Sequence, residues 1–520
     1  MELATLDISI FIIYVIALLA VAAWVSRSEK NHERDTSDYF LAGKSLPWWA
    51  IGASLIAANI SAEQIIGMSG SGYAIGLAIA SYEWMAAITL ILVGKYFLPI
   101  FLKRGIYTMP QFLEQRFDYR VRTVMAIFWL GVYVLVNLTS ILWLGGLAIE
   151  TVTGVDALHG MIFLVLFSIA YSLYGGLKAV ALTDIIQVVL LVAGGFMLSY
   201  LALERLGDGN GVIAGFSALT AAAPEKFDMI LSPDNPHYIS LPGLSVLIGG
   251  MWVMNISYWG CNQYIIQRAL AAKDLNEAHK GIAFAAYLKL LMPIIVVLPG
   301  IAAFVLHPSL SAPDQAYPTM MALMPVGLKG LIFAALVAAI VSSISSMSNS
   351  ISTIFTMDVY SKMVQDKSQS HYVNIGRLVS LSALMIALLV AKPLLGQFDQ
   401  AFQYIQEFTG FFTPGIVAIF FLGLFWKKAN GNGALVAALG SAGFSLAFKF
   451  FWPALPFIDR VGMVFLMCLI LGALVSITTG DDGETKAVRL ADINFHSAPT
   501  FNYAALGCVL ILTALYSTWW

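Results

Sequence analysis

Polar side chains interrupt a membrane-length apolar stretch between residues 51 and 84. In IGASLIAANISAEQIIGMSGSGYAIGLAIASYEW, Asn59, Ser61, Glu63 and Gln64 stand in the middle, and Glu83 lies near the end. An unsatisfied polar group in hydrocarbon costs several kcal/mol, so a broken helix with a polar centre persists only where it lines a cavity. The stretch therefore predicts a site that binds a solute or an ion. The alternative is a kinked packing helix in which Glu63 is paired.

A second interruption lies in residues 245–268, SVLIGGMWVMNISYWGCNQYIIQR. Gly249 and Gly260 bracket Asn255 and Tyr258 there. This is the seventh apolar span, five after the broken second one. Two discontinuous helices in corresponding places of two halves are typical of an inverted-repeat transporter with its site at the midplane. The alternative is that the glycines only allow close helix packing, and in that case they are no evidence for an inverted repeat.

Two further spans add polar groups, Lys289 within residues 285–300 and Gln406 with Glu407 within residues 402–415. Lys289 either enters the cavity or snorkels to the inner surface. Amides and carboxylates match vicinal hydroxyls, and aromatic faces cover the apolar face of a sugar ring. No arginine lies inside a span, which disfavours a carboxylate substrate. The spans therefore favour a neutral, polyhydroxylated solute.

Serines crowd one long apolar helix in AALVAAIVSSISSMSNSISTIFTMD, residues 334–358. Such hydroxyls either bond back to carbonyls of their own helix or face another element. The unwound backbone of AANIS offers free carbonyls opposite them. Together they predict a cage of hard oxygens, which suits an alkali cation such as sodium.

The composition requires a membrane protein. Of 520 residues, 59% are hydrophobic and 11% charged, and the mean hydropathy is +0.82. Lysine and arginine gather in the loops after odd-numbered spans, so both termini are expected outside the membrane. The apolar spans number about fourteen: 6–25, 47–75, 78–102, 123–150, 159–176, 181–203, 239–262, 280–306, 328–357, 376–394, 403–425, 432–452, 460–479 and 499–519.

The sequence lacks the motifs that are typical of other classes of protein. The three cysteines and seven histidines show no metal spacing, and no catalytic triad, HExxH or Walker-type loop is present. The basic dipeptides at 103–104 and 427–428 are topology signals and not a nucleic-acid site. We therefore expect neither an enzyme nor an organic cofactor. A channel would need a continuous polar pore without alternating gates.

Several long motifs carry a resemblance to a known family. They are YFLAGKSLPWWAIGASLIAANISAEQIIGMSGSGYAIGLAIASYEW, LVNLTS, YGGLKAVALTDIIQV, YWGCNQYIIQR and SSISSMSNSISTIFTMD. The chain resembles the sodium/solute symporter family, in its sodium/galactose (SGLT-type) branch, essentially from end to end. The resemblance implies an all-α, polytopic LeuT-type fold in a single transporter domain. Its parts are an extra first helix with its inner loop (1–46), two five-helix repeats (47–205 and 239–425) and three extra helices (432–520).

The resemblance also implies site residues. The sugar site falls on Gln64, Glu83, Asn255, Lys289 and Gln406, the stacking inner gate on Tyr258, and the outer cover on Met68, Tyr82 and Phe402. The sodium site falls on the carbonyls of Ala57, Ile60 and Ala339 and the hydroxyls of Ser342 and Ser343. Asn59 and Asn137 are expected to hold Tyr258, and Asp184 to lie on the inward sodium route.

The function implied is sodium-coupled symport of a neutral hexose across the inner (plasma) membrane. Inositol and sialic acid are the alternative solutes. The family's serine three residues after the YEW glutamate is Ala86 here, which leaves a hexose but puts galactose in doubt. Ser342, Ser345 and Ser346 share one helix face. With Asp184 they predict a second sodium site, unless Ser345 bonds to its own helix and Asp184 only relays one ion.

Overall fold

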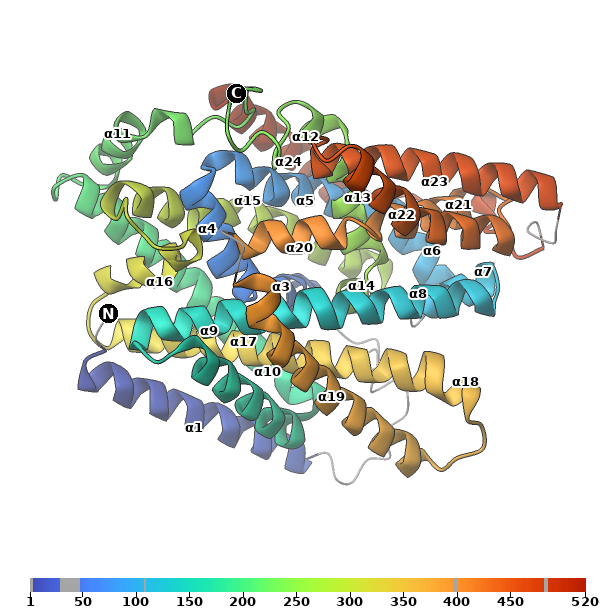
Figure 1. Cartoon of the computed structure of the whole chain (residues 1–520), viewed down its shortest axis with the longest axis horizontal. Coiled ribbons are helices and arrows are strands. Elements are labelled where there is room, and N and C mark those ends of the chain that lie inside the picture. Colours follow the sequence, from blue (N-terminus) through green and yellow to red (C-terminus); the bar gives the residue numbers. More distant parts are fainter. Residues whose placement is uncertain (1–2, 29–46, 107–108, 397–399, 481–484) are drawn as a thin grey trace.

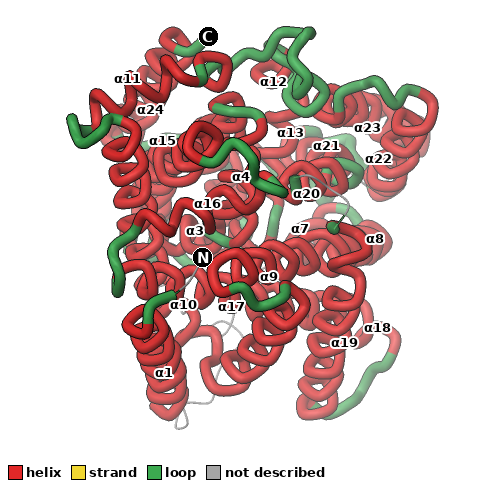
Figure 2. The backbone as a smooth tube through the Cα atoms, turned by 60° about the vertical axis from the view of Figure 1, so that its left-hand side comes forward, coloured by secondary structure: helices red, strands yellow, loops and turns green. Residues whose placement is uncertain are grey.

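The structure is a computed structural model that describes residues 3–28, 47–106, 109–396, 400–480 and 485–520. Within helices, only the backbone is described for 22–28, 171–185, 264, 267 and 369–370. Every regular element among the described residues is a helix (Figures 1 and 2). Most helices run along the long axis of the molecule (Figure 1). This arrangement confirms the predicted all-α, polytopic membrane architecture.

The predicted break in the second span is present at the centre of the molecule. Helix α3 (Trp48–Asn59) ends before the extended residue Ile60, and the chain resumes as the π-helical turn η2 (Glu63–Gly67) and helix α4 (Met68–Ala74). The two halves bend by 68°. Asparagine and serine side chains compete for backbone hydrogen bonds and weaken a helix, which accounts for a break in AANIS.

The seventh span is also interrupted. Helix α12 (Ser245–Ile248) ends at Gly249, and α13 (Gly250–Ile256), the π-helical turn η7 (Ser257–Cys261) and α14 (Gln263–Leu270) follow. A Cβ atom on Gly250 would collide with the Ile458 carbonyl of α23 (Phe457–Thr479). Close helix packing therefore accounts for this glycine, while η7 widens the helix at the predicted site.

A third break was not predicted. Helix α20 (Ala401–Thr409) and α21 (Thr413–Phe425) meet at 45°. The connecting residues contain Gly410, and Pro414 follows at the start of α21. Glycine just past a helix end and proline near the next helix start are ordinary signals of a helix break. The sequence FTGFFTPG therefore contained the signals for this break.

A bundle packs beneath the broken helices in Figure 1, and α10 packs on both α17 and α1. The bundle consists of α1 (Thr5–Ser28), α8 (Tyr119–Val132), η5 (Tyr133–Leu138), α9 (Thr139–Thr153), α10 (Ala157–Leu206), α17 (Leu328–Thr353), η10 (Ile354–Tyr360), α18 (Ser361–Met363) and α19 (Gln369–Leu395). The helix α10 covers both spans predicted at 159–176 and 181–203. The chain reverses direction within it, because Ser168 lies against Ser345 of α17, whereas Gly194 lies against Ile332 nearer the start of that helix. The two predicted spans therefore run in opposite directions. Asp184 lies outside the described side chains.

The remaining elements complete the upper part of Figure 1. These elements are η3 (Leu77–Ala80), α5 (Ser81–Leu92), η4 (Val93–Phe97), α6 (Leu98–Lys103), α7 (Met109–Arg116), α11 (Val212–Ala222), η6 (Pro224–Lys226), α15 (Leu275–Leu306), η8 (Pro313–Gln315), α16 (Ala316–Met320), η9 (Met321–Leu323), α22 (Gly431–Phe451), η12 (Leu490–Asp492) and α24 (Pro499–Thr518).

Part of the predicted fourteen membrane spans can be identified from helix length and composition. Among the described residues, nine helices are long and apolar enough to cross a membrane, and the two bent pairs make eleven. Shorter apolar helices at Thr5–Val21 and Ala157–Ala170 coincide with two further predicted spans. Each predicted apolar span contains helix, whereas the count and the repeat boundaries stay predictions.

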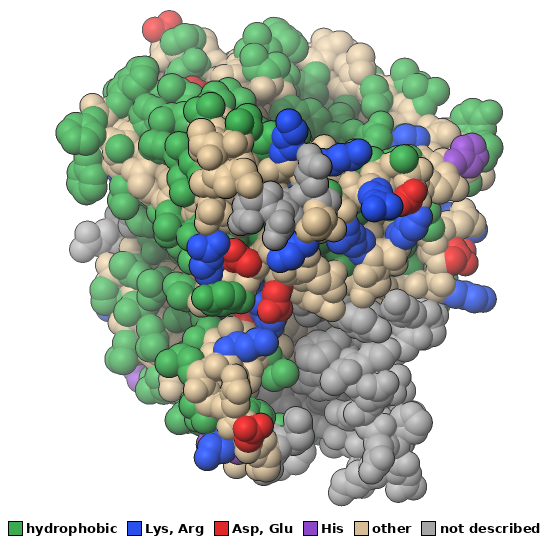
Figure 3. Space-filling model, turned by 90° about the vertical axis from the view of Figure 1, so that its right-hand side faces the viewer, with side chains coloured by type: hydrophobic (Ala, Val, Ile, Leu, Met, Phe, Trp, Pro, Cys, Tyr) green, Lys and Arg blue, Asp and Glu red, His purple; other side chains and the backbone are tan. Residues whose placement is uncertain are grey.

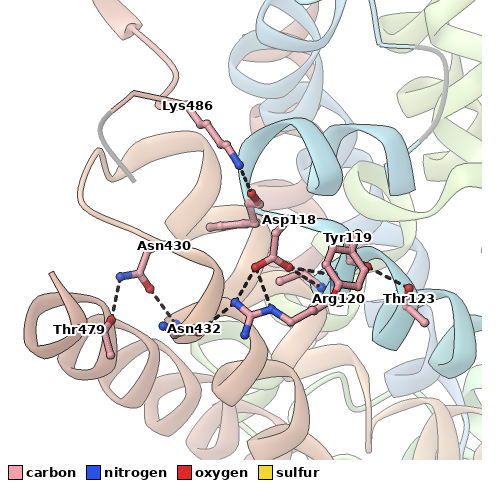
Figure 4. Close-up of polar contacts among 11 residues, drawn as sticks. Asp118, Tyr119, Arg120, Thr123, Asn430, Asn432, Thr479 and Lys486 are labelled. Carbon is pink, nitrogen blue, oxygen red and sulfur yellow. Dashed lines mark hydrogen bonds and ion pairs between the residues drawn. The ribbon is translucent and has the colours of Figure 1, made fainter. Parts of the chain in front are cut away.

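Basic side chains gather at the end of the molecule where α7 and α18 lie (Figure 3). The α7–α8 turn is fastened there to the start of α22 and to the segment after α23. Asp118 accepts hydrogen bonds from the backbone N–H groups of Arg120 (2.8 Å) and Val121 (3.1 Å), and the Arg120 guanidinium reaches Asn432 (3.0 Å; Figure 4). Lys486 donates to the Phe117 carbonyl at 2.7 Å. These contacts join distant parts of the chain at this end of the molecule.

Removing the carboxylate that caps α8 should destabilise this end. In Asp118→Ala the helix loses its cap, which is worth about 1 kcal/mol, and Arg120 loses its partner. We expect a lower midpoint of thermal unfolding for the purified protein in detergent. Thr123→Ala is the matched control, because that hydroxyl bonds only to the Tyr119 carbonyl of its own helix. Equal midpoints for Asp118→Ala and the wild type would contradict the capping role.

Candidate solute and sodium sites

A central cavity of about 140 Å³ brings together residues from seven helical segments of the fold. Its lining comes from the broken helix α3–η2–α4 and from α5, α8–η5–α9, α13–η7, α15, α17 and α20–α21. All nine residues assigned to solute binding line it: Gln64, Met68, Tyr82, Glu83, Asn255, Tyr258, Lys289, Phe402 and Gln406. Ala86 lines it too, as expected for the position where the family has serine.

A buried ion pair lies at the centre of this cavity. The Lys289 ammonium is 2.6 Å from Glu83 Oε2, and the two side chains are only 1% and 5% exposed. Lys289 also donates to Asn59 Oδ1 and lies 5.1 Å from the centre of the Trp259 ring. Lys289 therefore does not snorkel to the surface. Two charges held this deeply stabilise one another only while both are present.

Amide groups extend the ion pair in two directions. Gln64 Nε2 donates to Glu83 Oε1 at 2.6 Å, and Asn59 Nδ2 donates to the Tyr258 hydroxyl at 3.1 Å. Asn59 therefore connects Lys289 with Tyr258, which agrees with its expected role in holding that ring. Asn137 instead hydrogen bonds to Glu63. Its predicted role at Tyr258 stays a prediction.

The cavity is closed toward one side by three apolar side chains. The Tyr82 and Phe402 rings meet edge to face, with centroids 5.1 Å apart, and Met68 is buried beside them. In the other direction the cavity passes Tyr258 and reaches Tyr133 and Asn262. The residues expected to form the cover and the gate therefore line the same cavity as the polar groups.

A second, smaller cavity of about 10 Å³ has room for one small ion or water. It is lined by all five residues assigned to sodium: Ala57, Ile60, Ala339, Ser342 and Ser343. Ser343 also lines the central cavity. Carbonyl and hydroxyl oxygens are hard ligands that suit an alkali cation. One serine thus borders both the solute space and the candidate ion space.

Sequence reasoning missed Gln187 of α10. Its side chain is buried, lines the small cavity, and has an Nε2 atom without a hydrogen-bond partner among the described residues. The amide oxygen of this residue adds a further hard ligand. The signal was available, since Gln187 is a lone amide in the apolar run of α10. The motif YGGLKAVALTDIIQV also ends around it.

The predicted second sodium site is only partly described. The Ser345 hydroxyl lies 2.8 Å from the Ser168 hydroxyl of α10 and also donates to the Ser168 carbonyl. Ser345 therefore bonds across to another helix and not back to its own. Ser346 uses its carbonyl to accept from Ser350. With Asp184 outside the described side chains, the second site stays a prediction.

A buried carboxylate outside the spans holds the closed side of the cavity together. Asp314, in η8, accepts a hydrogen bond from the Ala401 N–H at the start of α20 through Oδ2 (2.9 Å), and its Oδ1 is buried without a partner. It also packs so closely on Gly70 of α4 that a Cβ there would collide with it. Burial raises the pKa of Asp314 to about 7, against the hydrogen bond from Ala401.

Comparison with known proteins identifies the family to which the chain is similar. A family model described as the sodium:solute symporter family matches residues 39–440. A sodium/glucose cotransporter of Vibrio parahaemolyticus is 52% identical over 537 aligned positions, covering 100% of this chain and 99% of that protein. The sodium/myo-inositol cotransporter 2 of Mus musculus is 33% identical, covering 82% of this chain and 67% of that protein.

Solved structures give the same fold. A Na⁺-coupled sialic acid symporter in a substrate-bound, outward-open state superposes with a TM-score of 0.77 at 25% identity, covering 91% of this chain and 98% of that one. A nucleobase-cation-symport-1 family transporter matches in fold alone, with a TM-score of 0.55 at 14% identity and coverage of 87% and 98%. The fold is of the LeuT type, and the matching family consists of secondary transporters and not of enzymes. The chain belongs to the sodium:solute symporter family.

The ion pair can be tested by a double-mutant cycle. Glu83→Gln and Lys289→Met each leave a buried charge unpaired, at a cost of about 3–5 kcal/mol, so each should lower the unfolding midpoint strongly. The double variant carries no unpaired charge and should lose less than the two single losses combined. Thermal unfolding of the purified protein measures all four. Additive losses would show that the two side chains do not stabilise one another.

Proposed function

We propose that this protein imports a neutral hexose together with sodium across the plasma (inner) membrane, with both termini outside. The observation that carries the proposal is the convergence of nine predicted solute ligands on one cavity that shares Ser343 with the candidate sodium cavity. Amides, a carboxylate and an ammonium supply paired donors and acceptors for hydroxyls, and Tyr258 supplies a ring face. The Vibrio sodium/glucose relative supports a hexose.

The driving force follows from one coupled ion. A sodium ion crossing about 100 mV contributes roughly 2.3 kcal/mol, and a tenfold gradient adds about 1.4 kcal/mol. Together these sustain roughly several hundredfold accumulation of a neutral sugar. Sodium bound between α3 and α17 would stabilise the broken helix that carries Gln64. Its inward release would free that helix and the Tyr258 gate.

Uptake of labelled hexoses into proteoliposomes tests the proposal. We expect saturable uptake that requires an inward sodium gradient and is competed by some hexoses more than others. Inositol is the second candidate, because a myo-inositol cotransporter is among the relatives and presents a similar ring of hydroxyls. Uptake of inositol without hexose uptake would replace the substrate but keep the mechanism. Uptake that ignores sodium would reject the mechanism.

Gln406 provides the sharpest test of the solute site. Gln406→Ala deletes a cavity-lining partner of a sugar hydroxyl, worth roughly 1–3 kcal/mol, and should lower hexose affinity about tenfold or more. The matched control is Gln403→Ala on the same helix, because Gln403 does not line the central cavity. Hexose competition in proteoliposomes measures both. Equal affinity in Gln406→Ala and the wild type would remove Gln406 from the site.

Ser343 tests the coupling. Ser343→Ala removes an oxygen from the small cavity and leaves a bound ion less well solvated, so sodium-driven uptake should be lost. Ser350→Ala serves as the control, because that hydroxyl bonds to the Ser346 carbonyl of its own helix. The measurement is the dependence of hexose uptake on sodium concentration. Full sodium dependence in Ser343→Ala would place the ion elsewhere.

Asp314 predicts a pH dependence of opening toward the covered side. The buried carboxyl has a pKa of about 7, and exposure to water on opening would return it toward its ordinary value of 3.8. Protonation at low pH therefore favours the covered state, and ionisation above about 7 favours opening. Raising the external pH from about 6 to about 8 should increase hexose uptake.

Asp314→Asn keeps an acceptor for the Ala401 N–H but cannot ionise, so this pH step should disappear. Elements packed on η8 also carry Glu63, Tyr73, Glu150 and Tyr317. A step that persists in Asp314→Asn would assign the titration to one of these groups or to another.

A further inference from the structure

A third cavity, of about 320 Å³, lies behind α20, on the side away from the central cavity. The two cavities share no lining residue: Phe402 and Gln406 line the central one, whereas Gln403 and Glu407 line the third. Its other walls come from the loop before α12 and from the α22–α23 hairpin. These wall residues are Ile239, Ser240, Lys449, Pro453, Leu455, Phe457 and Arg460.

The charges in this cavity do not balance. Glu407 accepts from both Lys449 and Arg460, the latter at 3.5 Å, so a single carboxylate serves two cations. The neighbouring Asp459 hydrogen bonds to Ser245 and does not line the cavity. Lys449 is 42% exposed and hydrated, whereas the Arg460 side chain is only 4% exposed. The surplus positive charge is therefore held at a buried guanidinium.

Some buried hydrogen-bonding groups of the residues that line this cavity also have no partner among the described residues. Among the residues that the structure describes, Arg460 Nε is buried without a partner, and so are both amide atoms of Gln403. The Arg460 guanidinium lies over the Phe411 ring, 4.8 Å from its centre. Arg460 and Gln403 both line the cavity, and guanidinium and amide N–H groups both donate to carboxylate oxygens. An unpaired buried donor otherwise costs free energy.

We propose that this cavity binds a small organic acid anion. Its carboxylate would accept from Arg460 Nε–H and the Gln403 amide and neutralise the surplus charge. Its apolar part would pack on Ile239, Leu455 and Phe457, which an inorganic anion cannot use. Because the ligand would join α20 to α23, it would restrain the short helix that also carries the covering residue Phe402. The proposal concerns binding alone and does not depend on which solute is transported.

Thermal unfolding of the purified full-length protein in a carboxylate-free buffer tests this site, with sodium benzoate as the probe and sodium chloride and benzyl alcohol as comparisons. Benzoate should raise the unfolding midpoint in a saturable manner. Benzyl alcohol lacks the charge and chloride lacks the apolar part, so both should have a much smaller effect. A shift with chloride equal to that with benzoate would overturn the organic-acid assignment, and no shift with benzoate would overturn the site.

Variants locate the binding. Arg460→Gln and Gln403→Ala should each weaken the apparent benzoate affinity about tenfold or more. Lys392→Gln is the matched control for the charge change, because Lys392 is exposed near the end of α19 and does not line the cavity. Gln403→Ala leaves every charge in place and carries the test if Arg460→Gln does not fold. Unchanged benzoate affinity in Gln403→Ala would overturn the proposal.

Discussion

The buried contact between Glu83 and Lys289 is the interaction on which the solute site depends. Each charge would be prohibitively costly alone at bilayer depth, so α5 and α15 must stay in register for the fold to hold. The other hydrogen bonds of these two side chains then position the polar residues of the cavity. Glu83 accepts from Gln64, and Lys289 donates to Asn59. Asn59 in turn holds the Tyr258 hydroxyl. A solute that replaces or adds to these hydrogen bonds would therefore affect both the broken helix α3–η2–α4 and the Tyr258 gate.

The same broken helix links the solute to the ion. The final carbonyls of an α-helix have no partner within the helix, and Ala57 belongs to the last turn of α3. Ala57 lines the small cavity together with Ser342 and Ser343. Asn59 in the same turn belongs to the solute network. One short turn would therefore serve both proposed sites, and a change in ion occupancy would reach the solute network without a long pathway.

Much of this site could be predicted, because membrane burial makes polar residues conspicuous. Glu83, Lys289 and Gln406 stood out in apolar runs, and the family resemblance supplied their roles. The break in AANIS was visible for the same reason. Sequence could not tell whether Lys289 snorkels, since that depends on the distant Glu83. The bend at Gly410 and the cavity behind α20 were missed, because they depend on how α22 and α23 pack against that helix. Gln187 was overlooked as a single amide within a long apolar run.

The central claim is that sodium and hexose binding are coupled through α3, and equilibrium binding tests it most directly. Hexose affinity of the purified protein can be measured in sodium and in potassium at equal ionic strength. Our account predicts markedly tighter hexose binding in sodium, and by thermodynamic reciprocity tighter sodium binding in the presence of hexose. In Ser343→Ala the two hexose affinities should become alike. Equal hexose affinity in sodium and potassium for the wild type would contradict the account.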